Sequence, residues 1–593
     1  MKQIPEFEEM ELGPDGRLRR EGIDLEMNPY CRRAVAKGVE LARSSGGTCT
    51  VITLGPPSAE EVLREAIAWG ASDGVLVTDP AFAGSDTLAT ARALAAALTR
   101  EGPFDLVLCG RNSVDADTGQ VGPELAELLD LPFATGVRHL AIDDRVAHVR
   151  AEHDDGWLQA DVPLPAVLST AERLCDPCKM DPDARAAVPA GRIRVLDAAS
   201  LGDGPWGQAG SPTTVGATRL HSVDRARLQW PDAPLGEQVH RAIEVLRGRG
   251  ALSGGRAEVP DGRGAVSTVP EPRAEGPLDV LVLVEPERRH LARELLGAAA
   301  VVGANRRARV AALVVDDLDL VDLGPWGADV ILFANGLHVE EDVAATAAAW
   351  CESQAPWAVL SPSTAWGREV GSRLAARLGA GLTGDAVALE VVGDRLVAWK
   401  PAFGGQLVAA ITASSPTQIV TVRAGMLPRL TPRPMPVPAP VTEIERHVRS
   451  RVHVLARARD DDLDVLADAT AIVGIGQGVD PGEYESLQPL LEVLGAELGA
   501  TRKVTDRGWL PRARQIGITG RSLAPRLFVS IGASGKFNHT VGLRGAGTVL
   551  AVNPDPQAPI FEVADAGIVG AWQEVLPLLV AELIAAGPSA PRR

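Results

Sequence analysis

Short apolar runs alternate along this chain with longer alanine-rich stretches, which is the pattern of repeated β-α-β units. After a gap in this pattern, a new apolar run at Leu278–Val284 begins a second series. We therefore expect an α/β fold with parallel sheets in both halves of the chain. The predicted elements of the first half are strands at residues 51–54, 106–109 and 166–169 and helices at residues 34–44 and 87–100.

A segment without apolar periodicity separates the two series. Residues 252–277 are rich in Gly, Pro and Arg, a composition typical of a linker. Three successive segments of the first half also recur in order in the second half, and each copy is followed by a charged turn that predicts a hairpin. The two halves are thus predicted to contain related domains. The matched pairs are 106–109 with 358–361, 122–129 with 371–378, and 135–136 with 383–384, and the turns are 143–145 and 393–395.

Composition limits the classes of partner. The 593 residues suffice for several domains, and 59 basic against 77 acidic side chains give a net charge of −18. Such a charge repels nucleic acids and anionic lipid surfaces. The longest apolar runs fall short of the roughly 18 residues that a membrane span requires, and no signal-peptide pattern opens the chain. We expect a cytoplasmic protein with no nucleic-acid partner, no membrane insertion and no disulfide framework from its six cysteines.

Polar residues follow two buried-type strands near the C-terminus. The runs Leu527–Ile531 and Thr548–Val552 predict parallel strands, and Ser534-Gly535 and Asn553 come directly after them. Such residues gather at the carboxyl edge of the sheet, where open α/β sheets hold ligands. The glycines of Gly474–Gly478 predict a strand-to-helix turn whose backbone amides suit a diphosphate. This region is therefore predicted to bind a dinucleotide.

Motifs in both halves, taken in order, resemble an electron transfer flavoprotein with its β and α subunits fused in that order. The resemblance implies two related adenine-nucleotide-hydrolase-like (Rossmann-like) parallel-sheet domains and a flavodoxin-like FAD-binding domain. Its implied bounds are 1–251 for the β-like domain, 252–277 for the linker, 278–450 for the α-like N-terminal domain and 465–593 for the FAD-binding domain. The motifs are 27–31 and 115–123 in the first half, and 499–509, 515–520, 534–539 and 553–565 in the second.

The resemblance also implies the ligands and their residues: one FAD in the C-terminal domain, AMP or a second FAD in the β-like half, no metal and no catalytic residue. The implied FAD residues are Gly476, Gln477, Gly478, Thr501, Arg502, Gln515, Gly517, Thr519, Gly520, Ser534, Gly535, His539, Asn553 and Asp565, and those for the second nucleotide are Asn28, Asp115, Asp117, Thr118, Gln120 and Gly122.

Individual roles follow from the same resemblance. Arg502 would lie over the flavin ring and raise its reduction potential, Thr519 would donate to N5, and His539 would face O2. Asn553 and Asp565 would contact the adenosine end, with Asp565 on the ribose. Each residue also has a structural alternative: a surface arginine, a turn or helix cap for Thr519, Asn553 and Asp565, and a structural histidine.

The sequence departs from the family pattern at several positions. Gln477 stands where an arginine is usual and Ile518 where a glutamine is usual, so we expect an altered reduction potential, with Lys536 supplying charge lost at Gln477. Residues 1–5 resemble the end of the family's first strand, so that strand is predicted to be missing. The charge run at 451–464 predicts either a mobile connection or a surface helix.

The predicted function is electron transfer: the protein accepts electrons from flavin-dependent or other dehydrogenases and passes them to an acceptor such as a quinone oxidoreductase, without a substrate of its own. Leu174, in a loop that resembles the family's docking loop, is the predicted partner anchor. Three alternatives stay open. They are electron bifurcation with two FAD and NADH, a flavin-free module that binds AMP and regulates, and a thiol oxidoreductase that uses Cys175 and Cys178.

Overall fold

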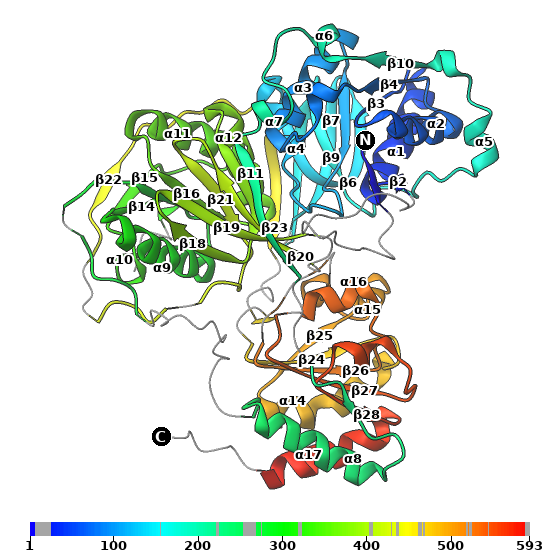
Figure 1. Cartoon of the computed structure of the whole chain (residues 1–593), viewed down its shortest axis with the longest axis vertical. Coiled ribbons are helices and arrows are strands. Elements are labelled where there is room, and N and C mark those ends of the chain that lie inside the picture. Colours follow the sequence, from blue (N-terminus) through cyan, green and yellow to red (C-terminus); the bar gives the residue numbers. More distant parts are fainter. Residues whose placement is uncertain are drawn as a thin grey trace. The chain divides into compact units, whose positions relative to one another are not determined.

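The computed structural model contains several parallel sheets flanked by helices (Figure 1), which confirms the predicted α/β fold. Contacts divide the chain into two compact units, residues 1–220 with 266–459 and residues 221–265 with 460–593. The domain bounds implied by the resemblance stay a prediction. The structure describes residues 1–5, 25–153, 156–220, 225–252, 268–273, 275–317, 323–402, 407–428, 430–434, 438–459, 465–466, 469–517, 520, 523, 525–543 and 545–586.

The first unit begins with a small parallel sheet in the order β10-β4-β3. Proline at the first helical position sets the backbone for α1, and Gly46, with φ of 69°, ends that helix. Residues 3–5 form a short strand that pairs with residues 25–27. The elements are β1 (Gln3–Pro5), β2 (Leu25–Met27), α1 (Pro29–Ser45), β3 (Thr50–Leu54), α2 (Glu60–Trp69), β4 (Asp73–Val77), α3 (Thr87–Glu101) and β10 (Ile193–Leu196).

A second sheet of this unit has the order β23-β8-β7-β6-β9-β5. β5 and β6 both run parallel to β9, while β6, β7 and β8 form antiparallel hairpins. The hairpin predicted at 143–145 is confirmed, since it joins β6 to β7. The elements are β5 (Leu106–Gly110), α4 (Val121–Leu128), β6 (Phe133–Asp143), β7 (Val146–His153), β8 (Gly156–Pro163) and β9 (Ala166–Thr170).

The second half contributes a seven-stranded sheet in the order β17-β21-β16-β13-β14-β15-β22, in which every paired strand is parallel. The predicted internal repeat is confirmed, because β16-α12-β17 corresponds to β5-α4-β6. The elements are β13 (Val280–Leu283), α9 (Arg289–Arg306), β14 (Val310–Val314), α10 (Leu323–Trp326), β15 (Val330–Phe333), α11 (Glu340–Gln354), β16 (Ala358–Pro362), α12 (Ala365–Leu378), β17 (Gly381–Ala386), β21 (Gln418–Val422) and β22 (Val441–Glu443).

The two halves exchange strands within the first unit. β11 (Thr213–Leu220) of the first half pairs with β20 (Leu407–Ala413), next to β19 (Arg395–Ala402) and β18 (Ala388–Val392). In return, β23 (His453–Arg459) of the second half pairs antiparallel with β8. Neither the mobile connection nor the helix predicted at 451–464 is therefore correct for residues 453–459, because backbone pairing makes them an edge strand; residues 460–464 lie outside the described part.

The second unit is one parallel sheet in the order β12-β28-β27-β26-β24-β25. Alternate side chains point to its two faces. α8, α14 and α17 cover one core, to which Val504 of α15 also belongs, while α16 lies on the opposite side (Figure 1). The elements are β12 (Leu228–Gln229), α8 (Leu235–Gly248), β24 (Ala471–Ile475), α14 (Gln488–Leu494), β25 (Glu497–Ala500), α15 (Arg502–Asp506), β26 (Leu527–Ile531), α16 (Phe537–Thr540), β27 (Thr548–Asn553), β28 (Ala566–Val569) and α17 (Trp572–Ala586).

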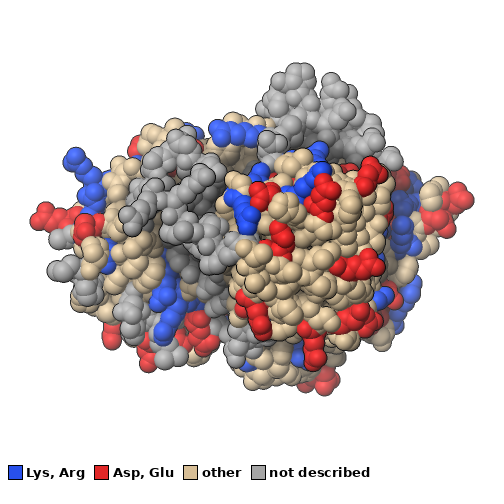
Figure 2. Space-filling model, turned by 90° about the horizontal axis from the view of Figure 1, so that it is seen from below, with Lys and Arg blue, Asp and Glu red and all other residues tan. Residues whose placement is uncertain are grey.

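Two surface properties bear on function. Among the described helices, none combines the length and the apolarity that crossing a membrane demands. On the face seen in Figure 2, acidic and basic side chains are interspersed among uncharged residues instead of forming one broad basic patch. This face therefore offers nothing typical of a nucleic-acid interface.

Candidate functional site

The carboxyl edge of the sheet in the second unit joins three of the predicted site segments. The N–H of Gly476, after β24, donates to the last carbonyl of β26 over 2.9 Å, and the N–H of Gly478 donates to Gly532 over 3.1 Å. After β27, the side-chain amide of Asn553 donates to the carbonyl of Ala533 over 2.9 Å. Three loops that are distant in sequence thus form one edge, at the position where parallel sheets hold ligands.

These loops approach each other so closely that they require glycine. A Cβ on Gly476 would lie 2.2 Å from the carbonyl oxygen of Gly532 and 2.5 Å from the Cα of Ala533. Gly535 has φ of +78°, and a Cβ there would lie 2.1 Å from the backbone nitrogen of Ile560. The exposed Ser534 stands beside it. The result is a rim of bare backbone, which can direct N–H groups at a phosphate.

Thr501 and Arg502 lie at the same edge, where β25 passes into α15. The N–H of Thr501 donates to the last carbonyl of β24 over 2.9 Å. Arg502 is 39% exposed in its side chain and donates from Nε to Asp506 over 3.1 Å. A surface ion pair of this kind contributes little stability, so the guanidinium is able to turn toward a ligand.

The segment 515–520 is partly described. Gln515 is buried, and its side-chain oxygen accepts from the hydroxyl of Thr505 over 2.7 Å, so this amide is held against α15. Gly517 has φ of +134°, and its carbonyl accepts from the N–H of Gly520 over 3.0 Å. Ile518 and Thr519, for which the sequence predicts contacts with the ring, lie outside the described residues.

His539 is a buried histidine with one ring nitrogen that makes no hydrogen bond to a described residue. It is buried, and its Nδ1 lies 3.2 Å from the carbonyl oxygen of Ile516. Its Nε2 is also buried and has no hydrogen-bond partner among the described residues. Burial lowers the pKa of His539 to about 4, so the ring is neutral at pH 7. A buried ring nitrogen without a partner fits a site that a polar group of a ligand completes.

A positive charge lies beside the glycine-rich loop, although not where the sequence predicts it. With its amide oxygen turned toward the guanidinium, Gln477 accepts from all three nitrogens of Arg507 at 3.0 to 3.2 Å. The guanidinium carbon of Arg507 also lies 4.8 Å from the ring centroid of Trp509. Arg507 thus brings a cation to the position where the sequence has lost an arginine, whereas the exposed Lys536 has no described contact with Gln477.

Asn553 and Asp565 have different surroundings. The side-chain oxygen of Asn553 accepts from the N–H of Asp555 over 2.9 Å, which orders the turn after β27. Asp565 is fully buried, and its Oδ2 accepts from the N–H of Val549 (2.8 Å) and from Arg225 (2.9 Å). Protein donors thus bind the carboxylate of Asp565. These contacts support a structural role for Asp565 over the predicted contact with the ribose.

The predicted second site lies between β5 and α4 of the first unit. Asn28 is buried; its Nδ2 donates to the carbonyl of Asn112 (2.9 Å) and its Oδ1 accepts from the N–H of Val114 (3.2 Å). Asp115 pairs with Lys2 over 2.7 Å. Burial alone would raise the pKa of Asp115, but the charge and hydrogen bond of Lys2 lower it overall. Both residues therefore hold the loop in shape.

At the end of this loop, several hydrogen-bond donors have no acceptor among the described residues. Asp117 and Gly119 have φ of 47° and 65°, a left-handed conformation that turns the chain into α4. Gln120 is buried, and its Oε1 accepts from Thr87 over 2.8 Å, while its Nε2 has no partner among the described residues. In the described part of the chain, the backbone N–H groups of Thr118, Gly119 and Gln120 have no intramolecular acceptor. Gly122 packs against Phe133 instead.

We predict that Glu124, one turn into α4, makes stability depend on pH. It is fully buried, one of its oxygens lies 3.0 Å from the hydroxyl oxygen of Thr87, and burial raises its pKa from 4.5 to about 8. The folded state therefore binds more protons than the unfolded state between these two values, and the free energy of unfolding falls as pH rises through that interval. Glu124→Gln should reduce this fall and stabilise the protein near pH 8 by on the order of a few kcal/mol.

Urea unfolding at about pH 6 and about pH 8.5 measures the effect of Glu124. The matched control is Glu61→Gln, at an exposed position of α2, which should leave the pH slope unchanged. The slope that remains in Glu124→Gln belongs in part to Glu369, whose pKa burial also raises. Equal slopes in the wild type and Glu124→Gln would contradict the prediction.

The loop after β9 gives no support to thiol chemistry. Cys175 and Cys178 are both free thiols, and burial raises the pKa of Cys178 to about 12 and that of Cys175 above its ordinary value. Thiols with raised pKa values react slowly. Leu174 is half-buried and packs partly against the core of the neighbouring sheet, so only part of it is available as a partner anchor.

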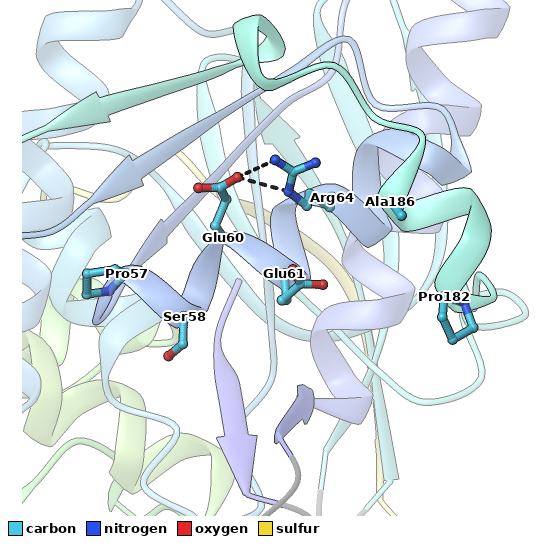
Figure 3. A pocket seen from close by; sticks show the side chains of 7 residues that line it. All are labelled: Pro57, Ser58, Glu60, Glu61, Arg64, Pro182 and Ala186. Carbon is cyan, nitrogen blue, oxygen red and sulfur yellow. Dashed lines mark hydrogen bonds and ion pairs between the residues drawn. The ribbon is translucent and has the colours of Figure 1, made fainter.

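Other hollows do not coincide with the predicted sites. One, of about 410 Å³, lies over α2 and α5 (Pro182–Ala186); there Glu60 pairs with Arg64 over 2.6 Å (Figure 3). Another, of about 330 Å³, is lined by residues 270–273 and by Arg433. None of the predicted site residues lines either hollow. In the described residues, no group of three or more His, Cys, Asp or Glu side chains is placed to hold a metal.

The open parallel sheets, the glycine edge and the left-handed loop before α4 define a nucleotide-binding α/β protein. Comparison with known proteins specifies the family: the model of the electron transfer flavoprotein domain matches residues 15–200 and 280–448, and that of the electron transfer flavoprotein FAD-binding domain matches residues 465–544. The chain therefore belongs to the electron transfer flavoprotein family, whose members are electron carriers.

Relatives of both subunit types confirm the predicted fusion. The chain is 36% identical over 316 residues, 51% of its length, to the electron transfer flavoprotein subunit alpha of Mycobacterium leprae, of which 96% is covered. It is 38% identical over 232 residues, 38% of its length, to the subunit beta of Thermoanaerobacterium thermosaccharolyticum, with 88% of that protein covered. A third relative, at 39% over 178 residues, is the caffeyl-CoA reductase-Etf complex subunit CarD of Acetobacterium woodii; the match covers 30% of this chain and 68% of that protein.

Proposed function

We propose that this chain is a single-chain electron carrier that accepts electrons from dehydrogenases and passes them to a downstream acceptor such as a quinone oxidoreductase. The observation that carries the proposal is the glycine edge of the second unit together with the buried Nε2 of His539, which has no hydrogen-bond partner in the described part of the chain. One FAD would be held there. The residues that we assign to it are Gly476, Gln477, Gly478, Thr501, Arg502, Gln515, Gly517, Thr519, Gly520, Ser534, Gly535, His539 and Asn553. Asp565 would act indirectly, by holding β27 in place through its hydrogen bond with Val549.

The residues of this edge fit the parts of FAD. The backbone N–H groups of Gln477, Ser534 and Gly535, which have no backbone acceptor among the described residues, would bind the diphosphate. Arg507 beside Gln477 would neutralise part of its charge. Arg502 and His539 would lie toward the ring, where the bound flavin supplies the redox chemistry. His539 is neutral when its site lacks a charge, so its Nε2 either accepts a hydrogen bond or gains a proton when negative charge develops nearby.

The loop between β5 and α4 is our proposed second nucleotide site, with Asn28, Asp115, Asp117, Thr118, Gln120 and Gly122 as its residues. Its uncommitted N–H groups suit the phosphate of AMP, and equally that of a second FAD. We favour AMP. Electron bifurcation, the alternative, would place a second FAD here and oxidise NADH.

The experiment is to purify the chain without added cofactors, record its visible spectrum, and identify and count the nucleotides released. One FAD and one AMP per chain, with reduction by a dehydrogenase and its substrate and reoxidation by a quinone acceptor, would support the carrier. Two FAD with NADH oxidation would replace it by bifurcation. A colourless protein that retains AMP would favour the flavin-free regulatory module.

We predict that Arg507→Gln weakens FAD binding about 3-fold to 10-fold at low salt, because a partly exposed charge next to a phosphate contributes on the order of 1 kcal/mol. The loss should shrink at high salt, since exposed charges are screened. FAD titration of the flavin-free protein at two salt concentrations measures it. Arg247→Gln, at an exposed position of α8 in the same unit, is the control, and an equal effect of both substitutions would count against Arg507.

A further inference from the structure

Lys400 is a buried lysine of the first unit. It lies on β19 of the second half and is 8% exposed, and its Nζ is buried with no partner among the described residues. The N–H of Val387 donates to the carbonyl of Trp399 over 2.8 Å, so Lys400 lies beside the end of β17. An ammonium in this position needs an anion, because burial removes the water that would otherwise solvate its charge.

Asp385 and Asp117 both act electrostatically on Lys400, and other cations share these two carboxylates. Asp385, at the end of β17, is bound by Arg423 on two nitrogens and lies 3.5 Å from Arg368. Asp117 of the first-half loop lies 4.0 Å from Arg423. Among the described groups that act on Lys400, two arginines and Lys400 itself thus face two carboxylates, which leaves an excess of positive charge. This imbalance within a largely buried cluster favours one further negative group.

The cluster faces the loop that we assign to the second nucleotide. A Cβ on Gly384 would lie 2.7 Å from the Nε2 of Gln120 and 3.7 Å from the Cα of Thr118, so β17 touches the loop. From the loop itself, a Cβ on Gly119 would lie 3.8 Å from the Cδ of Arg368 in α12. The side-chain amide of Gln120, the N–H groups of the loop and Lys400 thus belong to one neighbourhood. All of them are donors, and none has an acceptor among the described residues.

We propose that this neighbourhood is an anion site shared by the two halves, in which Lys400 of the α-like half binds the phosphate of the nucleotide held by the β-like loop. The ligand class is a nucleotide phosphate, and the proposal rests on the second nucleotide site proposed above. Burial lowers the pKa of Lys400 below its ordinary value, and a bound phosphate would reverse that shift. The exchange of β11 and β23 holds the two sides of the site together.

The test uses the full chain saturated with FAD and stripped of its second nucleotide, with calorimetric titration by AMP and by adenosine. Lys400→Met should weaken AMP binding about 10-fold to 100-fold and leave adenosine binding unchanged, because a charged hydrogen bond is lost. Lys400→Arg should keep most of the preference for AMP. The control is Lys179→Met, at an exposed position, which should bind like the wild type. Unchanged AMP binding by Lys400→Met would overturn the proposal.

A second measurement separates this proposal from the proposed function. If the wild type binds neither AMP nor adenosine, the second nucleotide site fails, and inorganic phosphate then tests the anion site alone. A rise in the melting temperature of the wild type with phosphate, absent in Lys400→Met, would support it, and equal responses would overturn it. Folding should not confound the comparison, because Asp385 keeps Arg423 and Arg368 as partners when Lys400 is replaced, and Lys400→Arg retains the charge.

Discussion

The Gly476→Ala protein should retain little or no FAD after purification. The added Cβ would lie 2.2 Å from the carbonyl oxygen of Gly532 and 2.5 Å from the Cα of Ala533. Both atoms belong to the backbone, so no side chain can rotate away and the loops after β24 and β26 must separate. Such overpacking destabilises a protein by roughly 1 to 3 kcal/mol. Here it would distort the loops at the sheet edge that would hold the diphosphate. We expect FAD affinity to fall about 10-fold to 100-fold or more.

The ratio of flavin absorbance to protein absorbance after gel filtration measures the retained FAD, and a titration with added FAD gives the dissociation constant. The matched control is Gly236→Ala in α8 of the same unit, where a Cβ meets no atom within 4 Å. This control should keep its flavin and be as stable as the wild type or slightly more stable, because alanine favours helices. Stoichiometric FAD in Gly476→Ala would contradict the assignment of this loop.

Buried strands could be predicted from the sequence almost to the residue. Leu527–Ile531 was expected and observed with identical bounds, because a fully buried parallel strand is a continuous apolar run between turn residues. The exchanged strands could not be predicted in the same way. Only the last four residues of β23 alternate alanine with arginine, and the strand pairs with β8, almost three hundred residues earlier, so the local sequence does not identify its partner. Its pairing is a property of the tertiary structure.

Some residues of the candidate site could likewise be predicted from the sequence, and others could not. Gly476 and Gly535 could be found because a close backbone approach requires glycine and leaves a mark in the sequence. Arg507 and Lys400 were missed, since a lone arginine or lysine carries no signal until folding brings it to Gln477 or to Asp385. Asp565 was assigned to the ribose from its place after a strand, and only the structure reveals Arg225 as its partner.

The two halves of the first unit also meet through a buried ion network centred on Arg373 of α12. Its side chain is 1% exposed and contacts three glutamates, Glu127 at 3.2 Å, Glu369 at 3.2 Å and Glu341 at 3.8 Å. Glu127 belongs to α4 of the first half, so Arg373 joins the repeated helices α4 and α12. Arg377 binds the same Glu127 over 2.6 Å but is 23% exposed.

Arg373→Met should lower the free energy of unfolding by about 3 to 5 kcal/mol, because removing one member of a buried ion network leaves its partners uncompensated. Urea unfolding followed by circular dichroism measures the loss. Arg377→Met is the matched control; it removes a more exposed arginine from the same glutamate and should cost no more than about 1 kcal/mol. Combining Arg373→Met with Glu369→Gln should recover part of the loss only above about pH 8, because burial raises the pKa of Glu369 to about 8 and its carboxyl is an uncompensated charge only when it is ionised. Equal losses for the two arginines would show that burial does not govern this network.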